Sequence, residues 1–454
     1  MFFNFECENF KSLREETFFS ALASVDDTHE ELVGKFDELR YLKTLLVYGP
    51  NGSGKTNLVD AMEYMKNLVL LNQVVEGEKL VTYPNKLVGN LLPSYFQMMF
   101  SGKNNVRYFY GFKIKDGLVV AEFLCKFPNG RKTVIFIRDI NEGITEGAQY
   151  KGKFEHLGAS LKNNQLLLTR AKLASSLEDI DVCYYFFKDD LLFYRGNSFF
   201  IAPQGGDSNF WSTLKEMNEN EKFKKGILEI LNAIGIHVHD VVVEKKMIEP
   251  GSLSLMCMAN PQNLLMSQYT HDYTAKLVYN DFSTNLISEE SSGIQKLFSL
   301  FYPLYDAVKN DKVLICDELE AFLHPNLICK IVEIFSTVLS KESNAQLITT
   351  THCLDVLNIK SLRRDQVYFT DFKKDRSTEL YSLDNIKGVR KTEDFRRFYR
   401  HGDYGAIPTY TDDFIHRVCE FVFSPLSHNS CDRRSSIVED QEHATKDSWN
   451  LSIL

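Results

Sequence analysis

The stretch LLVYGPNGSGKTN, residues 45–57, decides the fold prediction. It contains the pattern G-x-x-x-x-G-K-T, which runs from Gly49 to Thr56. The three residues from Leu45 to Val47 are all apolar, which is typical of a strand buried on both faces in a parallel sheet. After the threonine, apolar side chains recur at helical spacing, at Leu58, Met62, Met65 and Leu68. A strand, a glycine-rich loop and a helix in this order predict a phosphate-binding loop.

The residue types in this loop suit a nucleoside triphosphate. The glycines let backbone N–H groups turn toward an anion, and the helix that begins near Gly54 adds the positive end of its dipole. The Lys55 ammonium can bridge the β- and γ-phosphates, and the Thr56 hydroxyl can ligate Mg²⁺. An ordinary glycine turn is the less favoured interpretation. The predicted nucleotide-binding residues are Gly49, Pro50, Asn51, Gly52, Ser53, Gly54, Lys55, Thr56 and Asn57.

A second motif, KVLICDELE at residues 312–320, reads as another buried strand that ends in acids. Asp317 stands where a strand delivers a carboxylate beside Thr56, so we expect it to hold Mg²⁺ directly or through water. Glu318 follows, where it can orient or deprotonate an attacking water. The strand QLITTTH ends at His352, and ligands bind at the carboxyl ends of parallel strands. We therefore predict Glu318, His352 and Lys55 as the catalytic residues.

A third motif, EESSGIQK at residues 289–296, precedes an amphipathic helix. Ser291 or Ser292 is a natural helix N-cap, and the serine and glycine at an exposed helix N-terminus form another anion site. Lys55 and Asp317 are separated by more residues than a compact phosphate-loop domain requires, so the sequence predicts an insertion between the motifs.

Composition narrows the class of protein. The chain has 454 residues, 44% of them hydrophobic and 13% aromatic, which suffices for two or three folded domains. A formal charge of −9 argues against a globally basic nucleic-acid coat. Nine singly scattered cysteines fit free thiols in a reducing cytoplasm. With no signal-peptide pattern and no long apolar run, we expect a cytoplasmic protein that does not cross a membrane.

Together these motifs resemble the ABC-type ATPase fold, and more closely the AAA15/AAA21-type ATPases related to the RecF and OLD proteins. The resemblance rests on seven short segments of the sequence: YGPNGSGKTN at 48–57, ESSG at 290–293, DELEAFLHP at 317–325, TTTH at 349–352, RRDQVYF at 363–369, LYSL at 380–383 and YGAIP at 404–408. The resemblance implies an α/β fold: an ABC-type phosphate-loop ATPase head, with a mixed or parallel sheet flanked by helices and an inserted, mainly helical lid.

The same resemblance implies how the head works. Two heads would sandwich two Mg²⁺-bound ATP molecules, with Ser291, Ser292 and Gly293 of one copy reaching the γ-phosphate held by the other. Gln97 would be a γ-phosphate-sensing residue and a metal ligand beside Thr56 and Asp317. The sequence departs from the family pattern at three positions, Ile294, Cys353 and Asp403. None of these three departures removes a group that the predicted chemistry needs.

The predicted domain organisation has four parts. Residues 1–135 and 246–410 form the two halves of the ATPase head, 136–245 form the inserted helical subdomain, and 411–454 form a partly disordered extension. Residues 106–126 read as alternating strands, whereas 163–232 read as helical. No heptad repeat persists, so long coiled-coil arms are not expected.

Several other patterns are weaker. His237 and His239 could form a metal pair, but no third ligand is near in sequence. The acids Asp179 and Asp181 resemble a TOPRIM pair without its upstream glutamate strand, and Arg396 with His401 resembles a HEPN ribonuclease pair. The basic, aromatic segment at 387–401 is a candidate nucleic-acid or acidic-protein surface, although an amphipathic helix packing its aromatics inward is the favoured reading.

We expect a slow Mg²⁺-dependent ATPase whose output is conformational. The length and architecture resemble stand-alone ATPases of anti-phage defence, including the ATPase subunit of the PARIS system. That resemblance implies a homo-oligomer that senses a phage-encoded trigger and controls a separate toxic effector such as a TOPRIM nuclease. The alternatives are a RecF-like repair ATPase that binds DNA and an ATPase fused to its own nuclease.

Overall fold

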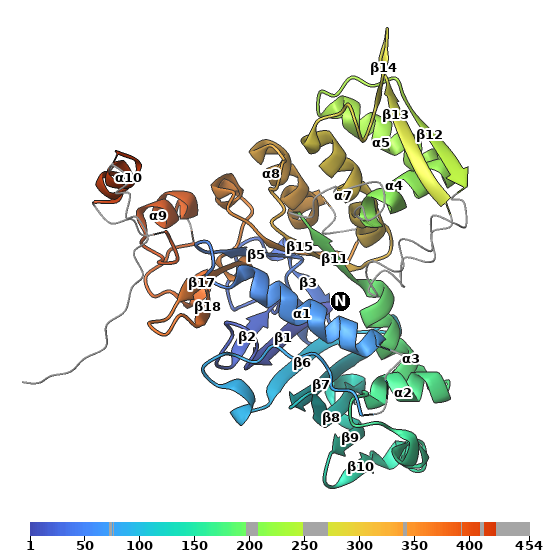
Figure 1. The fold of residues 1–454 in the computed structure, drawn as a ribbon. Coiled ribbons are helices and arrows are strands. Elements are labelled where there is room, and N and C mark those ends of the chain that lie inside the picture. Colours follow the sequence, from blue (N-terminus) through green and yellow to red (C-terminus); the bar gives the residue numbers. More distant parts are fainter. Residues whose placement is uncertain are drawn as a thin grey trace, which may run out of the picture. The chain divides into compact units, whose positions relative to one another are not determined.

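The computed structural model describes residues 1–71, 75, 77–196, 208–247, 271–338, 343–391, 393–408 and 413–423 (Figure 1). Residue contacts divide the chain into two units, Met1–Pro408 and Thr409–Leu454. The first unit holds every predicted motif. In the second, the described residues form one helix, α10 (Phe414–Phe423), and the rest of the predicted disordered extension lies outside the described residues.

A six-stranded sheet forms the centre of the first unit, in the order β11-β15-β16-β5-β17-β18. The first five strands run parallel, and β18 pairs antiparallel to β17. The strands are β5 (Thr44–Tyr48), β11 (Leu191–Arg195), β15 (Val313–Asp317), β16 (Gln346–Thr350), β17 (Val367–Phe372) and β18 (Thr378–Ser382). The predicted strands at 45–47 and 312–317 are therefore neighbours of β16 at the centre of this sheet.

Both faces of this sheet are buried, because alternate side chains of β5 enter different cores. Leu45 and Val47 join a core with α1 (Lys55–Leu70) and a second sheet. Leu46 and Tyr48 join a core with α7 (Ser292–Lys309) and α8 (Pro325–Glu333). This arrangement explains why the strand sequence is apolar without alternation.

The second sheet has seven antiparallel strands in the order β10-β9-β8-β7-β6-β1-β2. They are β1 (Phe2–Glu8), β2 (Thr17–Ser20), β6 (Ser94–Ser101), β7 (Arg107–Lys115), β8 (Leu118–Phe127), β9 (Thr133–Asp139) and β10 (Gly143–Glu146). The strands predicted within 106–126 correspond to β7 and β8. A hairpin of β3 (Gly34–Phe36) and β4 (Leu39–Tyr41) lies outside this sheet.

The segment read as helical, 163–232, contains α2 (Leu167–Ala174), α3 (Glu178–Tyr185), α4 (Ser208–Glu219) and α5 (Glu221–Ala233). The helical reading is wrong at β11, because residues 191–195 form a strand that pairs in parallel with β15. Leu191 and Tyr194 are buried there, so both side chains belong to the hydrophobic cores. The subdomain boundaries at 135/136 and 245/246 stay a prediction.

Three more strands, β12 (Asp240–Met247), β13 (His271–Val278) and β14 (Ser283–Asn285), form a small sheet beside α4 and α5 (Figure 1). The remaining elements are α9 (Phe395–His401), the π-helical turns Phe186–Asp190 and Ile334–Val338, and short 3₁₀ turns at Glu30–Leu32, Gly89–Leu91, Pro128–Gly130, Ala148–Tyr150, Glu155–Ser160, Leu354–Asn358, Arg364–Gln366 and Leu383–Asn385.

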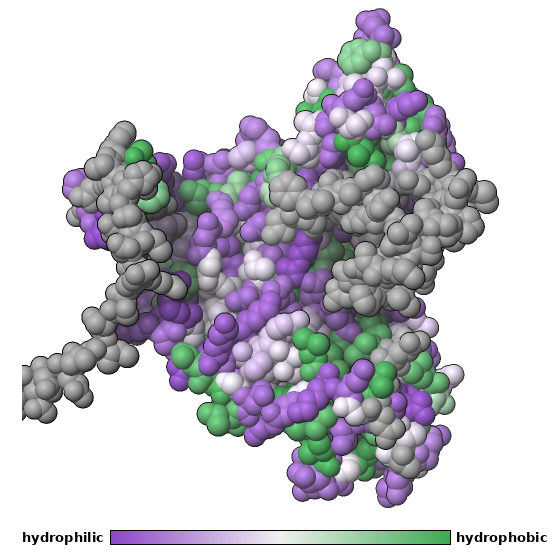
Figure 2. All heavy atoms as spheres, viewed as in Figure 1, coloured by the Kyte–Doolittle hydropathy of each residue, from purple (hydrophilic) through white to green (hydrophobic). Residues whose placement is uncertain are grey.

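The visible surface is mixed in polarity. Figure 2 shows hydrophobic side chains in separate patches among hydrophilic ones, as is normal for a folded domain whose cores are internal. Among the described residues, every helix is too short or too polar to span a membrane.

Candidate functional site

The glycine loop joins β5 to α1 and packs tightly against β17 and β18. Gly54 precedes the helix with a φ of 111°, and a Cβ there would lie 2.0 Å from the Thr378 hydroxyl. Thr378 donates a hydrogen bond to the Ser53 carbonyl at 2.7 Å. The Ser53 hydroxyl lies 2.6 Å from that of Thr370. Position 54 therefore requires glycine, both for its backbone conformation and for this close approach.

Lys55 lies inside this loop. Its side chain is buried, and its ammonium donates to the carbonyls of Gly49 at 2.8 Å and Pro50 at 3.2 Å. Burial lowers the pKa of Lys55, while the carboxylates of Glu320, Asp317 and Glu318 oppose that shift. The loop lysine and the acids of the second motif therefore share one electrostatic environment.

Asp317 ends β15 with a fully buried carboxylate that three elements hold in place. Its Oδ1 accepts a hydrogen bond from the Thr350 hydroxyl at 2.7 Å and lies 3.5 Å from the Thr56 hydroxyl. Its Oδ2 accepts from the Arg195 guanidinium at 2.9 Å. The structure thus brings Thr56 and Asp317 together, and both offer the oxygen ligands that Mg²⁺ prefers.

Glu318 follows in a left-handed conformation, with a φ of 55°. Its amide donates to the Thr350 hydroxyl at 2.8 Å, so Thr350 holds the backbone of Glu318 and the side chain of Asp317 at once. A non-glycine residue in this conformation is strained and persists only where its surroundings fix it. The backbone therefore turns sharply at the end of β15, and hydrogen bonds hold both acids, Asp317 and Glu318, in place.

His352 lies just beyond the end of β16. Its amide donates to the Glu320 carboxylate at 2.6 Å. Burial lowers the pKa of the imidazole and the nearby Lys55 ammonium lowers it further, while Glu320 opposes the shift. His352 and Gly49 line one cavity of about 290 Å³, together with Tyr399 and Arg400. The structure thus places the predicted histidine beside the phosphate loop.

The serine–glycine motif lies at the start of α7. Ser291 is the N-cap, and its hydroxyl accepts a hydrogen bond from the Ile294 amide at 3.4 Å. A Cβ at Gly293 would lie 2.9 Å from the Phe322 carbonyl, so this motif packs against the turn that follows the acid pair. Within the described parts of the chain, no hydrogen bond joins residues 291–293 to the phosphate loop of the same copy.

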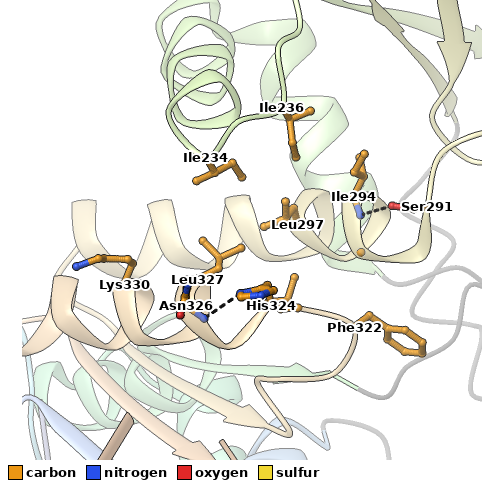
Figure 3. Close-up of a pocket in the computed structure, with 12 residues that line it drawn as sticks. Ile234, Ile236, Ser291, Ile294, Leu297, Phe322, His324, Asn326, Leu327 and Lys330 are labelled. Atoms are coloured by element: carbon orange, nitrogen blue, oxygen red, sulfur yellow. Dashed lines mark hydrogen bonds between the residues drawn. The ribbon is translucent and has the colours of Figure 1, made fainter. Parts of the chain in front are cut away.

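An open pocket of about 510 Å³ borders this motif (Figure 3). Ser291 and Ile294 line it from α7, His324 and Leu327 from the start of α8, and Ile234 from the end of α5. Figure 3 shows His324 as the cap of α8, with its ring nitrogen accepting from Asn326. The N-termini of α7 and α8 therefore lie on the same pocket.

Gln97 is not brought to the metal pair. It lies on β6, where its amide hydrogen-bonds the side chains of Glu6 and Tyr95. Among the described residues, no hydrogen bond connects it to Thr56 or Asp317. Its sensing and metal-binding role, inferred from resemblance, stays a prediction.

The weaker sequence patterns have structural explanations. Asp179 is part of a hydrogen-bond network, in which it accepts from Tyr108 at 2.7 Å, from Tyr150 at 2.5 Å and from Lys126 at 3.0 Å. Arg396 pairs with Asp355 at 2.8 Å. No cluster of three or more metal-ligating side chains occurs in the part of the chain that is described.

The basic helix α9 buries part of its aromatic side. Phe395 and Tyr399 are 5% and 6% exposed, and Asp394 caps the helix by accepting from the Arg397 amide. This confirms the amphipathic reading of the aromatic residues in 387–401. Two basic residues of the same segment are engaged within the chain, since Lys391 pairs with Asp26 and Asp27 and Arg396 with Asp355. Whether the segment binds nucleic acid or an acidic protein stays an open alternative.

Sequence reasoning missed three side chains that shape the site. Thr350 lies in the TTTH motif, whose sequence does not show that its hydroxyl bonds both the Asp317 side chain and the Glu318 amide. Glu320 lies in the DELE motif, but the sequence indicates roles only for the first two acids of that motif, Asp317 and Glu318. Arg195 follows the apolar run LLFY, which is the signal that could have revealed a strand ending in a charged residue at the same sheet edge.

This fold and this site have the features of an ABC-like phosphate-loop ATPase head: a phosphate loop after a central strand, an acid pair at the end of another strand of the same parallel sheet and a late serine–glycine helix. The chain belongs to the family described as "AAA domain, putative AbiEii toxin, Type IV TA system", whose profile matches residues 45–169 and 228–358. A search of curated proteins found no significant match.

Solved structures that are similar to this chain include two Smc head domains and RecF. An Smc head bound to the C-terminal winged-helix domain of ScpA is 14% identical, with 84% of this chain and 97% of that chain covered and a TM-score of 0.44. The SMC head domain from Thermotoga maritima is 11% identical, with 84% and 98% covered and a TM-score of 0.35. RecF with a bound ATP analogue is 14% identical, with 77% and 92% covered and a TM-score of 0.34.

Proposed function

We propose that this chain binds ATP with Mg²⁺ at the phosphate loop and hydrolyses it slowly. The observation that carries the proposal is the convergence of Lys55, Thr56 and Asp317 at one edge of the sheet, with the Thr56 hydroxyl 3.5 Å from the buried Asp317 carboxylate. A lysine in a glycine loop beside a hydroxyl and a carboxylate is the arrangement that P-loop nucleoside triphosphatases use.

The residues present fit a magnesium ion. Two hard oxygen donors, the Thr56 hydroxyl and Asp317 Oδ1, lie together, and the buried carboxylate would gain a cation in exchange for its lost hydration. Bound there, the ion would neutralise charge on the β- and γ-phosphates. The loop amides and Lys55 would hold the triphosphate in place.

Glu318 is the proposed general base, and His352 the proposed contact to the γ-phosphate. Glu318 stands next to the metal carboxylate, on a backbone that Thr350 holds through the Glu318 amide. The lowered pKa of His352 keeps its imidazole neutral near pH 7, able to accept or donate one hydrogen bond.

The serine–glycine helix would complete the site from a second copy. Ser291, Ser292 and Gly293 sit at the N-terminus of an eighteen-residue helix, α7, whose dipole attracts anions. In the ABC-type ATPases that the sequence resembles, this helix reaches the γ-phosphate held by the partner copy, so the same residues here would contact a phosphate across a pair of copies. ATP would then stabilise the closed pair more than the open one.

At the level of the cell, we propose a cytoplasmic sensor and scaffold of anti-phage defence, in which a homo-oligomer of this ATPase responds to a phage-encoded trigger and controls a separate toxic effector such as a TOPRIM nuclease. The family description, which refers to a toxin of a type IV toxin–antitoxin system, supports the defence context. A RecF-like DNA-binding role is the second candidate, favoured by the basic residues of 387–401 around Arg400 beside the nucleotide cavity.

The first test is biochemical. Purified protein should bind ATP more tightly with Mg²⁺ than with EDTA, and Lys55→Ala should weaken that binding at least tenfold, because Lys55 contacts the phosphates. Unchanged binding in Lys55→Ala would refute the nucleotide site.

A second test separates the roles in the cell. Fluorescence anisotropy with duplex DNA over a salt series should show steep salt dependence for a RecF-like protein and little binding for a sensor. Incubation of the purified chain with Mg²⁺ and plasmid or tRNA should leave them intact, whereas cleavage would support a fused nuclease.

A further inference from the structure

Arg195 connects three parts of the head at the nucleotide edge of the central sheet. It is the last residue of β11 and stands in register with Asp317, the last residue of β15. Its guanidinium donates to Asp317 Oδ2 at 2.9 Å and to Asp60 Oδ1 at 2.5 Å, and it also pairs with Glu63. Asp60 and Glu63 both belong to α1, the helix that follows the phosphate loop.

Arg195 is the cation in direct contact with the Asp317 carboxylate. Three carboxylates, those of Asp60, Glu63 and Asp317, pair with its guanidinium, and Lys11 also pairs with Asp60 at 2.5 Å. The other oxygen of Asp317 lies 3.5 Å from the Thr56 hydroxyl, where the cation would bind. Removing the arginine would make the site more negative.

The residue after Arg195 touches the same acids through the backbone. The Gly196 amide donates to the Asp317 carbonyl at 2.7 Å. A Cβ on Gly196 would lie 1.9 Å from the Glu318 carbonyl oxygen, which leaves space only for glycine. The end of β11 therefore fixes Asp317 by its side chain and the backbone of the acid pair by direct contact.

We propose that Arg195 is a positioning residue that orients Asp317 and competes with the divalent cation for its carboxylate. The inference rests on the proposed function, since it assumes that Asp317 holds the cation. Arg195 has two separable properties: its charge, which opposes the cation, and its planar fork, which ties Asp317 to α1. The positive charge of Arg195 lowers the affinity of the site for the cation. Its hydrogen bonds to Asp317 and to α1 keep the Asp317 carboxylate oriented for turnover.

The two properties predict different results for two variants. Arg195→Gln loses the charge, so the cation should bind on the order of tenfold more tightly. Arg195→Lys keeps the charge and loses the fork, so metal affinity should stay within about twofold of wild type. Turnover should fall in both variants by about tenfold or more, the usual cost of removing a group that orients a metal ligand.

The experiment measures Mn²⁺ bound by the full chain with a non-hydrolysable ATP analogue, by electron paramagnetic resonance, together with phosphate release from Mg²⁺-ATP. Arg40→Gln is the matched control, because Arg40 also bridges several groups, including Glu30 and the Ser24 carbonyl, away from the loop. It should change neither readout. Thermal melting reports folding in every variant.

Asp60→Asn provides a test of opposite sign that does not depend on Arg195→Gln folding. It removes one negative charge beside the site, so Mn²⁺ should bind about threefold more weakly. Wild-type Mn²⁺ affinity in Arg195→Gln, wild-type turnover in Arg195→Lys, or tighter binding in Asp60→Asn would overturn the inference. Failure of the wild-type chain to bind Mn²⁺ with the analogue would instead refute the proposed function.

Discussion

Glu318→Gln is the substitution that isolates the chemical step. The side-chain amide of glutamine has nearly the same shape as the glutamate carboxylate. The hydrogen bond from the backbone N–H of residue 318 to the Thr350 hydroxyl, at 2.8 Å, keeps the backbone in place. What is lost is the proton acceptor. A positioned general base contributes about 10²–10⁴-fold to rate, or about 2.7–5.4 kcal/mol of barrier. Lys55 and Thr56 are unchanged, so ATP affinity should change by less than about twofold.

The assay is phosphate release at saturating Mg²⁺-ATP, paired with equilibrium binding of a fluorescent nucleotide. Glu320→Gln is the matched control, because Glu320 is a nearby acid that accepts the His352 amide at 2.6 Å. A glutamine oxygen can accept the same hydrogen bond, so this variant should lose less than about tenfold in rate. The assignment of the base would be refuted if Glu318→Gln turned over within about threefold of wild type. It would also be refuted if Glu320→Gln lost more turnover than Glu318→Gln.

Three further predictions use the same site. Gly54→Ala should weaken ATP binding tenfold or more by calorimetry, because a φ of 111° costs alanine about 1–3 kcal/mol and its Cβ would meet the Thr378 hydroxyl at 2.0 Å; wild-type affinity would contradict this. Thr350→Val should lower the free energy of unfolding by about 1–3 kcal/mol in urea, because it leaves the buried Asp317 carboxylate without one donor; an unchanged midpoint would count against it. Burial and a nearby lysine lower the pKa of His352 below 6.5, so its contribution to stability should be constant above that pH and decline as the pH falls from 6.5 toward the lowered pKa of the folded state. Turnover should decline as the folded imidazole itself is protonated, and His352→Asn should remove both steps from the pH profiles.

The nucleotide-binding half of the site could be predicted because its determinants are local. Gly49 to Thr56 form a continuous loop whose backbone conformation needs glycine, and the apolar run before Asp317 identifies a buried strand without any knowledge of its partners. The N-cap is local as well: Ser291 or Ser292 was expected, and Ser291 caps α7. These features depend on neighbours within a few residues.

The other residues of the site are brought together by the pairing of strands that lie far apart in the chain. The spacing of residues in one sequence does not show which strands pair. Residues 191–195 look like part of a helical, aromatic-rich insertion, yet they add an edge strand to the central sheet beside β15. That pairing alone brings Arg195 to Asp317. The position of Gln97 depends on distant pairing as well, because the register of β1 and β6 places it opposite Glu6. Its γ-phosphate-sensing role stays a prediction.

The central claim is that the loop of one copy and the serine–glycine helix of another enclose the same nucleotide. Subunit complementation tests it directly: Lys55→Ala inactivates the loop, Gly293→Asp inactivates the helix tip, and each variant alone should be inactive. A mixed pair contains one intact composite site, so an equimolar mixture should regain about a quarter of wild-type phosphate release if copies assort randomly in symmetric pairs. A mixture no more active than the sum of the two variants would contradict the account.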